Sequence, residues 1–492
     1  MASFSFKRKG RRPQSATPTS KPVSKSKGTS EVANWSPLQT DVHINQLAVC
    51  PKYRTSDKAS IESSLDVREK QEQLVYGCGY PGLLIASLNV RTGALSRLPV
   101  PVPRNPNALQ SIDHDTDELH VLADTKATCL VFVGSWQVWI GTEHDTLHVL
   151  NCACDENAIQ SHNLLQLHDS VLCVIPGPEV DGSRSVYAGT ASGRLVMFTG
   201  PTDSHGGLTD PFADQLCIDL MSGINRRYTG SAPIKTATFA DNGRLWCGVG
   251  MSIMVFDPKT LTIDYEFKAE APREDDIPNH GRKIVAHLQP SDVGIWSACW
   301  HAPAVYLWDI QNYTLKASIV SNAFRATAGW VEASADITAL AVDCSACLLL
   351  VGTRGGHTLI FDILPSSTSV ASFKPRFLSS VHHGTGAIRS IQLINDISAA
   401  LKSAYGVEEQ SDAHRANSEE VRVKVVNCAS SSLSQEGSVL FVWEFQIPQD
   451  RERLERQMRH WTLIESQKSS FIYPPLRLVH VAPTALVTTP LT

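Results

Sequence analysis

The chain lacks any segment that would carry it across a membrane. None of its 492 residues belongs to an apolar run approaching the roughly 18 consecutive residues that a membrane-spanning helix needs. Its first thirty residues also lack the apolar central region of a secretory signal. We therefore expect a cytoplasmic protein without a transmembrane segment.

Sequence motifs for nucleotide and phosphoryl chemistry are missing as well. The sequence contains no Gly-Lys pair, which excludes a G-x-x-x-x-G-K-[S/T] phosphate loop. His-Arg-Asp and Asp-Phe-Gly, which mark protein kinases, are absent, and no leucine-rich repeats occur. These absences predict a protein that is not an enzyme and that needs no cofactor.

Cysteine is present without a disulfide or metal pattern. The twelve cysteines are scattered, and most lie in apolar strand patterns, which favours reduced, buried thiols. Cys344 and Cys347 have the spacing of zinc ligands, but a structural zinc site needs four ligands and no second pair answers them. Cys152 and Cys154 share one face of a strand. We expect no metal site, and we interpret the loop pair His382-His383 as solvated.

Charge is divided unevenly along the chain. The first thirty residues hold eight basic and no acidic side chains, whereas the rest holds 36 basic against 49 acidic ones. An acidic body argues against nucleic-acid binding, because phosphates need a basic surface. The basic tail can serve nuclear entry, peripheral contact with anionic lipid, or only solvation; its candidate targeting residues are Lys7, Arg8, Lys9, Arg11 and Arg12.

A repeated pattern organises the remainder. With 30 Gly and 27 Pro, the sequence repeats an apolar strand with a small residue, a tight turn, and a second apolar strand ending in an aromatic residue. The small residues that mark the units are Gly77, Gly141, Gly189, Gly248, Ala298, Gly352 and about Ala429.

Seven such units predict an all-β, seven-bladed, WD-repeat-like propeller. Each unit contains about four short strands, and an isolated blade cannot cover both of its apolar faces, so neighbouring blades must pack against it. Hairpins of two β-sandwich domains are the alternative, but sandwiches do not require one spacing along the whole chain. We predict a disordered basic tail at 1–35, the propeller at 36–446, a C-terminal α-helix at 447–468, and a tail of unknown structure at 469–492.

The predicted C-terminal helix has one apolar and one basic face. Leu454, Met458 and Trp461 recur at helical spacing, with Arg456 and Arg459 opposite them. The two arginines form a candidate interaction surface for an acidic partner; a solvated face is the alternative.

Four further residues resemble functional motifs but favour structural roles. Ser192 lies in a hairpin, one place late for the G-x-S-x-G nucleophile motif. His168 precedes an inner strand, where WD repeats often keep a histidine that hydrogen-bonds within its blade. Asp309 and Asp362 follow aromatic residues, as in the Trp-Asp ending of such repeats.

Two stretches of the repeat resemble a known family. Ala188-Gly189-Thr190-Ala191-Ser192-Gly193 and Val351-Gly352-Thr353-Arg354-Gly355-Gly356-His357 look like blades of the C-terminal propeller of leucine-rich-repeat kinases of the Roco family, as does Val442-Trp443-Glu444 before a charged segment. The resemblance covers roughly residues 74–467 and implies a propeller without the GTPase and kinase domains, from a truncated product or a detached module. Propellers of Rho exchange factors and vesicle-adaptor scaffolds are similar.

These patterns predict a non-catalytic scaffold that binds other proteins and that can form a homodimer through its propeller. The alternative is the regulatory C-terminal part of a Roco-type GTPase and protein kinase, or of a Rho exchange factor, in signalling or vesicle trafficking. A propeller hydrolase would need carboxylates or histidines clustered near the ring axis, and the inner segments show almost none.

Overall fold

The computed structural model describes eighteen stretches of the chain. They comprise residues 38–40, 43–49, 74–80, 83–89, 95–101, 125–153, 158–220, 232–269, 284–300, 302–320, 336–344, 347–364, 373, 375–382, 386–394, 420–430, 438–448 and 478–479. The predicted tail at 1–35, with its five candidate targeting residues, lies outside the described residues. So do most of the predicted C-terminal segments, including Arg456 and Arg459.

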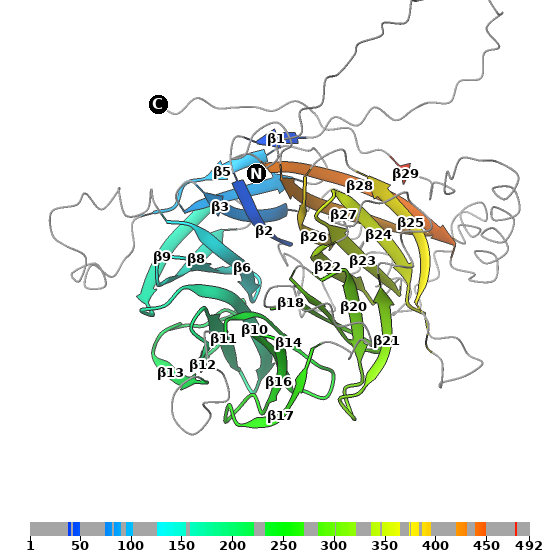
Figure 1. Ribbon diagram of the computed structural model, residues 1–492. Coiled ribbons are helices and arrows are strands. Elements are labelled where there is room, and N and C mark those ends of the chain that lie inside the picture. Colours follow the sequence, from blue (N-terminus) through cyan, green and yellow to red (C-terminus); the bar gives the residue numbers. More distant parts are fainter. Residues whose placement is uncertain are drawn as a thin grey trace, which may run out of the picture. The chain divides into compact units, whose positions relative to one another are not determined.

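Seven antiparallel sheets form the seven predicted blades. In blades 1 to 6 the four strands follow the chain order from the ring axis outwards (Figure 1). These are β2 (His43–Val49), β3 (Leu74–Tyr80), β4 (Leu84–Asn89) and β5 (Leu95–Leu98); β6 (Ala127–Val133), β7 (Gln137–Thr142), β8 (Thr146–Ala153) and β9 (Ala158–Gln166); β10 (Val171–Val180), β11 (Ser183–Thr190), β12 (Arg194–Pro201) and β13 (Asp214–Asp219); β14 (Ile234–Phe239), β15 (Leu245–Val249), β16 (Ser252–Phe256) and β17 (Ile263–Lys268); β18 (Val285–Ser291), β19 (Gly294–Cys299), β20 (Ala304–Trp308) and β21 (Leu315–Val320); β22 (Ile337–Asp343), β23 (Leu348–Thr353), β24 (His357–Asp362) and β25 (Arg376–His382).

Blade 7 combines the two ends of the described chain. It contains β26 (Ile388–Ile394), β27 (Glu420–Ser430), β28 (Ser438–Pro448) and the early strand β1 (Leu38–Thr40), which pairs with β28. The short β29 (Leu478–Val479) also pairs with β28. The inner strands pack each against the next, and β2 packs against β26, so the ring is closed (Figure 1).

Residues 447 and 448 are strand rather than the predicted helix, because β28 continues through Pro448. Pairing of Glu420 with Pro448 extends the β27–β28 ladder to this point, and proline is tolerated at a strand end. The prediction was wrong for 447–448, and 449–468 lies outside the described residues. Every described regular element is a strand, so no described helix could span a membrane.

Small residues in the second strands let neighbouring blades approach. A Cβ on Gly141, Gly189, Gly248 or Gly352 would lie 2.6–2.7 Å from a methyl group of the next blade, which leaves no room for a side chain. The facing residues are the first residues of the next inner strands, in the same order Val171, Ile234, Val285 and Ile388. These glycines are therefore needed for space, since none has a positive φ.

Two predicted markers are displaced by one residue. The position equivalent to Gly141 is Cys78 in blade 1 and Cys428 in blade 7, as the strand register shows, rather than Gly77 and Ala429. Cys78 shares a buried cluster with Ala127, the first residue of the next inner strand. At this boundary the larger residue, Cys78, lies in the second strand and the smaller one, Ala127, in the next inner strand. The glycine boundaries have the reverse arrangement, so the total side-chain volume at the boundary is kept similar.

Every inner strand carries a bulge near its start. The register with the second strand shifts at the same place in all seven blades, for example between Ile234 and Thr236. Side chains at the shifts bond to the next blade. Leu130 N donates to Gln46 Oε1 (3.2 Å), Leu288 N to Thr236 Oγ1 (3.1 Å) and Leu47 N to Ser390 Oγ (3.3 Å). Polar links at the bulges therefore join neighbouring blades at the inner ring.

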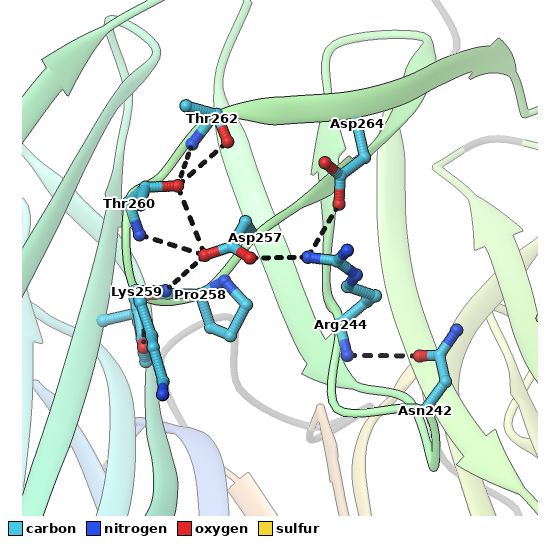
Figure 2. A network of polar contacts seen from close by, with 9 residues as sticks. Asn242, Arg244, Asp257, Pro258, Lys259, Thr260, Thr262 and Asp264 are labelled. Atoms are coloured by element: carbon cyan, nitrogen blue, oxygen red, sulfur yellow. Dashed lines mark hydrogen bonds and ion pairs between the residues drawn. The ribbon is translucent and has the colours of Figure 1, made fainter.

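An aspartate closes the outer turn of blade 4 (Figure 2). Asp257 Oδ1 accepts hydrogen bonds from the backbone N–H groups of Lys259 and Thr260, while Oδ2 pairs with Arg244 at 2.7 Å. Arg244 also pairs with Asp264 in the outermost strand. This network ties the third strand to the second and fourth strands of one blade.

Asp309 and Asp362 occupy the same place in blades 5 and 6. Asp309 accepts from the backbone of Gln311 and pairs with Lys316 at 2.8 Å, and Asp362 pairs with Arg376 at 3.0 Å. Both aspartates therefore make the structural contacts that the sequence predicts.

The connection between β12 and β13 lies against the neighbouring blade 2. Trp136 Nε1 donates to Asp203 (2.8 Å), and buried Gln137 exchanges hydrogen bonds with both the backbone N–H and C=O of Leu208. The Gln137 amide oxygen also accepts from Trp139 Nε1 at 2.8 Å. This strap adds a polar connection between blades 2 and 3, away from their inner strands.

Candidate interaction surface

Turns between the second and third strands have a common design in blades 2, 3 and 6. Thr142, Thr190 and Thr353 end the second strands, and each Oγ1 accepts a backbone N–H bond from the residue four places on, at 3.0–3.2 Å. The hydroxyl satisfies a turn donor that would otherwise need water. These turns are therefore closed by their own sequence.

Blades 4 and 5 depart from this design. The strand register puts Val249 and Cys299 where blades 2, 3 and 6 have threonine, and blades 1 and 7 have Gly79 and Ala429 there, so none of these four positions offers a threonine hydroxyl to its turn. The turns instead display Met251 and Trp300, which are 54% and 41% exposed. Because local rules are most often broken at functional sites, we single out this pair of turns.

Backbone hydrogen bonds hold the two turns together. Gly250 N donates to Pro233 O, Val285 N donates to Gly250 O at 2.8 Å, and Trp300 N donates to Ile284 O at 2.7 Å. Lys235, the bulge residue of β14, follows Pro233 by two places and extends its ammonium to 3.5 Å from the centre of the Trp300 ring. We call Lys235, Met251 and Trp300 the rim patch.

The rim patch carries one positive charge. Burial lowers the pKa of Lys235 below its ordinary value, whereas the facing aromatic ring stabilises the charged ammonium form. Among the described residues no carboxylate forms an ion pair with Lys235. The ammonium is therefore a half-buried charge without a described counter-ion.

His287 lies beside this charge and stays neutral. Burial first, and then the positive charge of Lys235, lower the pKa of His287 to about 4. A backbone hydrogen bond with Thr338 in the next blade opposes this shift. At neutral pH the boundary of blades 4 and 5 therefore holds a lysine cation next to an uncharged imidazole.

A pair of histidines lies within blade 2. The carbonyl of Pro101 can only accept, so His162 donates its Nδ1–H there (2.8 Å) and its Nε2 accepts from Nδ1–H of His148 (2.8 Å). Thr146 Oγ1 then donates to His148 Nε2 at 3.0 Å. Burial lowers the pKa of both imidazoles, the proximity of His162 lowers that of His148 further, and the bond to the Pro101 carbonyl opposes the shift at His162.

Two further residues that the sequence singled out, His168 and Ser192, lie in neighbouring turns of the structure. The prediction for His168 was wrong: this side chain is exposed at a positive φ of 56°, and its neighbour Asp169 instead accepts from both the backbone N–H and the hydroxyl of Ser192. A carboxylate suits this role better, because it can accept both bonds at one oxygen. The Ser192 hydroxyl closes a turn, as its position in a hairpin predicts.

Six of the ten described cysteines are buried thiols, as their strand patterns predict, whereas Cys217 and Cys344 are exposed. Ten of the twelve lie in the described residues, and all ten are free. Cys152 is buried, whereas Cys154 and His383 lie outside the described residues. Cys344 and Cys347 close a tight turn through a bond from Cys347 N to Cys344 O, and no metal-binding group of His, Cys, Asp or Glu occurs where the chain is described.

Sequence reasoning missed the rim patch because its members are far apart in the chain. Lys235 and Trp300 belong to different repeat units, and no spacing within one unit connects them. A usable signal was present in the alignment of the units. Threonine precedes the turn in blades 2, 3 and 6 but not at Gly79, Val249, Cys299 or Ala429.

A closed ring of seven sheets, linked at its inner strands, defines a WD-repeat-like β-propeller, a fold that serves as a platform for protein interaction. Residues 104–426, about two thirds of the chain, match the family described as LRRK2 beta propeller, and the chain belongs to this family. The resemblance to the propeller of leucine-rich-repeat kinases is thereby confirmed.

The chain is also similar to curated and structurally characterised proteins. It is 26% identical over 268 residues to Rho guanine nucleotide exchange factor 17 of Mus musculus and of Homo sapiens, in line with the second predicted resemblance. The matched region covers 52% of this chain but 12% of each relative's length.

Two solved structures are similar in shape. A chain in a crystal structure of the mitotic checkpoint complex has a TM-score of 0.45 and 10% identity, covering 75% of this chain and 87% of that one. Saccharomyces cerevisiae Sqt1 has a TM-score of 0.44 and 9% identity, covering 76% of this chain and 81% of that one.

Proposed function

We propose that this chain is a non-catalytic, cytoplasmic protein-interaction scaffold that binds a partner protein through the rim patch. The observation that carries the proposal is the exposure of Met251 and Trp300 on adjacent turns that have lost the threonine closure. Tryptophan and methionine are enriched at protein interfaces, where they fill pockets on the partner. The backbone bonds around them supply a rigid support, which reduces the entropy lost on binding.

The proposal is tested by affinity capture from native cells with the full chain as bait. The test variant is the double substitution Met251→Ser and Trp300→Ser. The matched control is Val180→Ser with Leu364→Ser, because those side chains are exposed to a similar extent, 52% and 44%, at other turns. Thermal denaturation first establishes that both variants are folded.

We expect the wild-type chain and the control to retain a stoichiometric partner that the rim variant loses. The purified partner should then bind the wild-type chain at least about tenfold more tightly than the rim variant, since a central tryptophan commonly contributes 2 kcal/mol or more. Equal binding by all three proteins would refute the rim patch as the binding surface. Turnover by the purified chain in a broad hydrolase screen would refute the non-catalytic assignment.

A second candidate function is regulatory. Membership of the LRRK2 beta propeller family, and similarity to part of a Rho guanine nucleotide exchange factor, support a role beside a GTPase, kinase or exchange-factor domain in signalling or vesicle trafficking. Binding of the chain to such a domain added in trans, followed by a change in that domain's activity, is the expected result. Absence of both binding and any activity change would count against it.

Homodimer formation and peripheral membrane contact remain predictions of the sequence. Light scattering of the purified chain across a concentration series distinguishes monomer from dimer. Sedimentation with vesicles containing anionic lipid tests the basic tail. Replacing Lys7, Arg8, Lys9, Arg11 and Arg12 by glutamine should abolish vesicle binding if the tail carries it.

A further inference from the structure

We propose that the rim patch selects a short acidic segment of its partner, which sets a carboxylate on Lys235 and packs an apolar side chain against Trp300 and Met251. The inference rests on the proposed function and names the chemistry of the partner.

Charge complementarity is the first step. Lys235 is half-buried and has no described carboxylate partner, although the chain as a whole has more acidic than basic residues. A half-buried ammonium is stabilised by an opposite charge more than an exposed one, because less water screens the pair. Other bulge residues add no competing carboxylate, since the seven are Asn45, Thr128, Leu172, Lys235, Ala286, Thr338 and Arg389.

The geometry leaves the ammonium able to bind an acceptor. A lysine has three N–H donors, and the Trp300 ring covers one side of the ammonium at 3.5 Å. A carboxylate that approaches from another side can accept a charge-assisted hydrogen bond while the ring contact persists. A single lysine beside a neutral His287 matches a singly charged carboxylate, whereas phosphate recognition typically uses clustered arginines.

The apolar part of the patch supplies the second contact. Met251 is flexible and adapts to side chains of different shape, and Trp300 is large and held at its backbone by Ile284. Together they favour a leucine, methionine or aromatic residue next to the carboxylate. The expected motif is therefore an apolar residue flanked by aspartate or glutamate.

A library of random nine-residue peptides displayed on phage tests this motif with the full chain as the immobilised target. We expect peptides with an apolar residue flanked by acidic residues to be enriched over the unselected library. Synthetic copies should bind the wild-type chain in a fluorescence anisotropy titration, and binding should weaken as salt is raised from about 50 to about 200 mM. Enrichment of neutral or basic peptides, or of none, would overturn the proposal.

Three variants identify the residue responsible. Lys235→Gln should weaken binding of the selected acidic peptide about tenfold. A library selected on Lys235→Glu should instead be enriched in basic peptides. The control Lys259→Gln removes an exposed lysine from another turn of blade 4 and should leave binding unchanged. Retention of acidic selection by Lys235→Glu would overturn the proposal even if all variants are folded.

The outcomes separate this inference from the proposed function. If capture of the native partner depends on Met251 and Trp300 but the library selects no acidic motif, the rim patch remains the interaction surface and the acidic partner is refuted. If the library selects acidic peptides through Lys235 but the native partner binds the rim variant as tightly as the wild type, the proposed function is refuted and the ligand chemistry is retained.

Discussion

Gly189 and Ile234 meet at the boundary between blades 3 and 4, where a Cβ on the glycine would lie 2.6 Å from Ile234 Cγ2. The same relationship between a glycine and a β-branched residue recurs at three other boundaries. It shows that the marker residues of the repeat are selected by the neighbouring blade rather than by their own turn. Its energetic weight can be measured directly.

Gly189→Ala should destabilise the propeller by about 1–3 kcal/mol, because the added methyl group has no space in a packed boundary. Gly200→Ala, in the next strand of the same blade, is the control; its nearest neighbour would be 3.6 Å away, so we expect little change. Urea denaturation measures both. Ile234→Ala should recover part of the loss in the double variant, and strict additivity would contradict the proposed contact.

Gln137→Leu should cost about 3 kcal/mol or more. The substitution removes the hydrogen-bond partner of four polar groups, namely Trp139 Nε1, Asn151 Oδ1 and the backbone N–H and C=O of Leu208, and it leaves the Trp139 and Leu208 groups buried. Thermal denaturation measures the loss, and limited proteolysis at 201–213 detects release of the strap. A variant that keeps both wild-type stability and protease resistance would show that the strap is held by other contacts.

Acid should destabilise the fold at mildly low pH. The pKa of His287 is lowered to about 4, and those of His148 and His162 are lowered too, so the unfolded chain binds protons that the folded one does not. The stabilisation from His287 is complete above about pH 6.5, the usual unfolded value, and is lost as pH falls from there to about 4.

Urea denaturation at pH 7 and at pH 5 measures this loss. We expect a decrease on the order of 1–3 kcal/mol from His287 alone. His287→Gln should show a smaller decrease, and the exposed control His168→Gln should behave as the wild type. Identical pH dependence of His287→Gln and wild type would exclude His287 as a source of the acid sensitivity.

Asp257→Ala should destabilise blade 4 by about 1–2 kcal/mol, since it removes the acceptor that closes the outer turn together with the partner of Arg244 (Figure 2). Asp257→Asn should lose less, because the amide oxygen still accepts the backbone bonds. Asp264→Asn removes only the second partner of Arg244 and serves as the control. Equal losses for Ala and Asn at 257 would show that the ion pair, not the turn, dominates.

Much of the architecture could be predicted from the repeat. Gly141, Gly189, Gly248, Ala298 and Gly352 lie at equivalent positions of their second strands, since small residues at a boundary leave a signal that spacing detects. Cys78 and Cys428 escaped detection because a thiol is not recognised as the small residue when a glycine or alanine is adjacent. The outer strand of blade 7 was missed since three residues, Leu38–Thr40, are too few to show a period.

The rim patch could not be predicted from any single unit. Lys235 reaches Trp300 only because the packing of blade 5 against blade 4 brings the start of one inner strand to the turn of the next blade. The histidine pair of blade 2 shows the same limit, because His162 depends on a carbonyl at Pro101 in the preceding connection. Such contacts follow from tertiary packing, which local patterns do not encode.

The contact of β2 with β28 sets a minimum time for ring closure during synthesis. Ile44 N donates to buried Ser438 Oγ across 394 residues of chain, so the first blade cannot meet its last neighbour until that serine has been made. At about 5–20 residues per second, a ribosome needs roughly 20–80 seconds for this interval. Blades that fold within that time would have no closed ring, and the apolar faces of the first and last of them would stay uncovered until Ser438 is made.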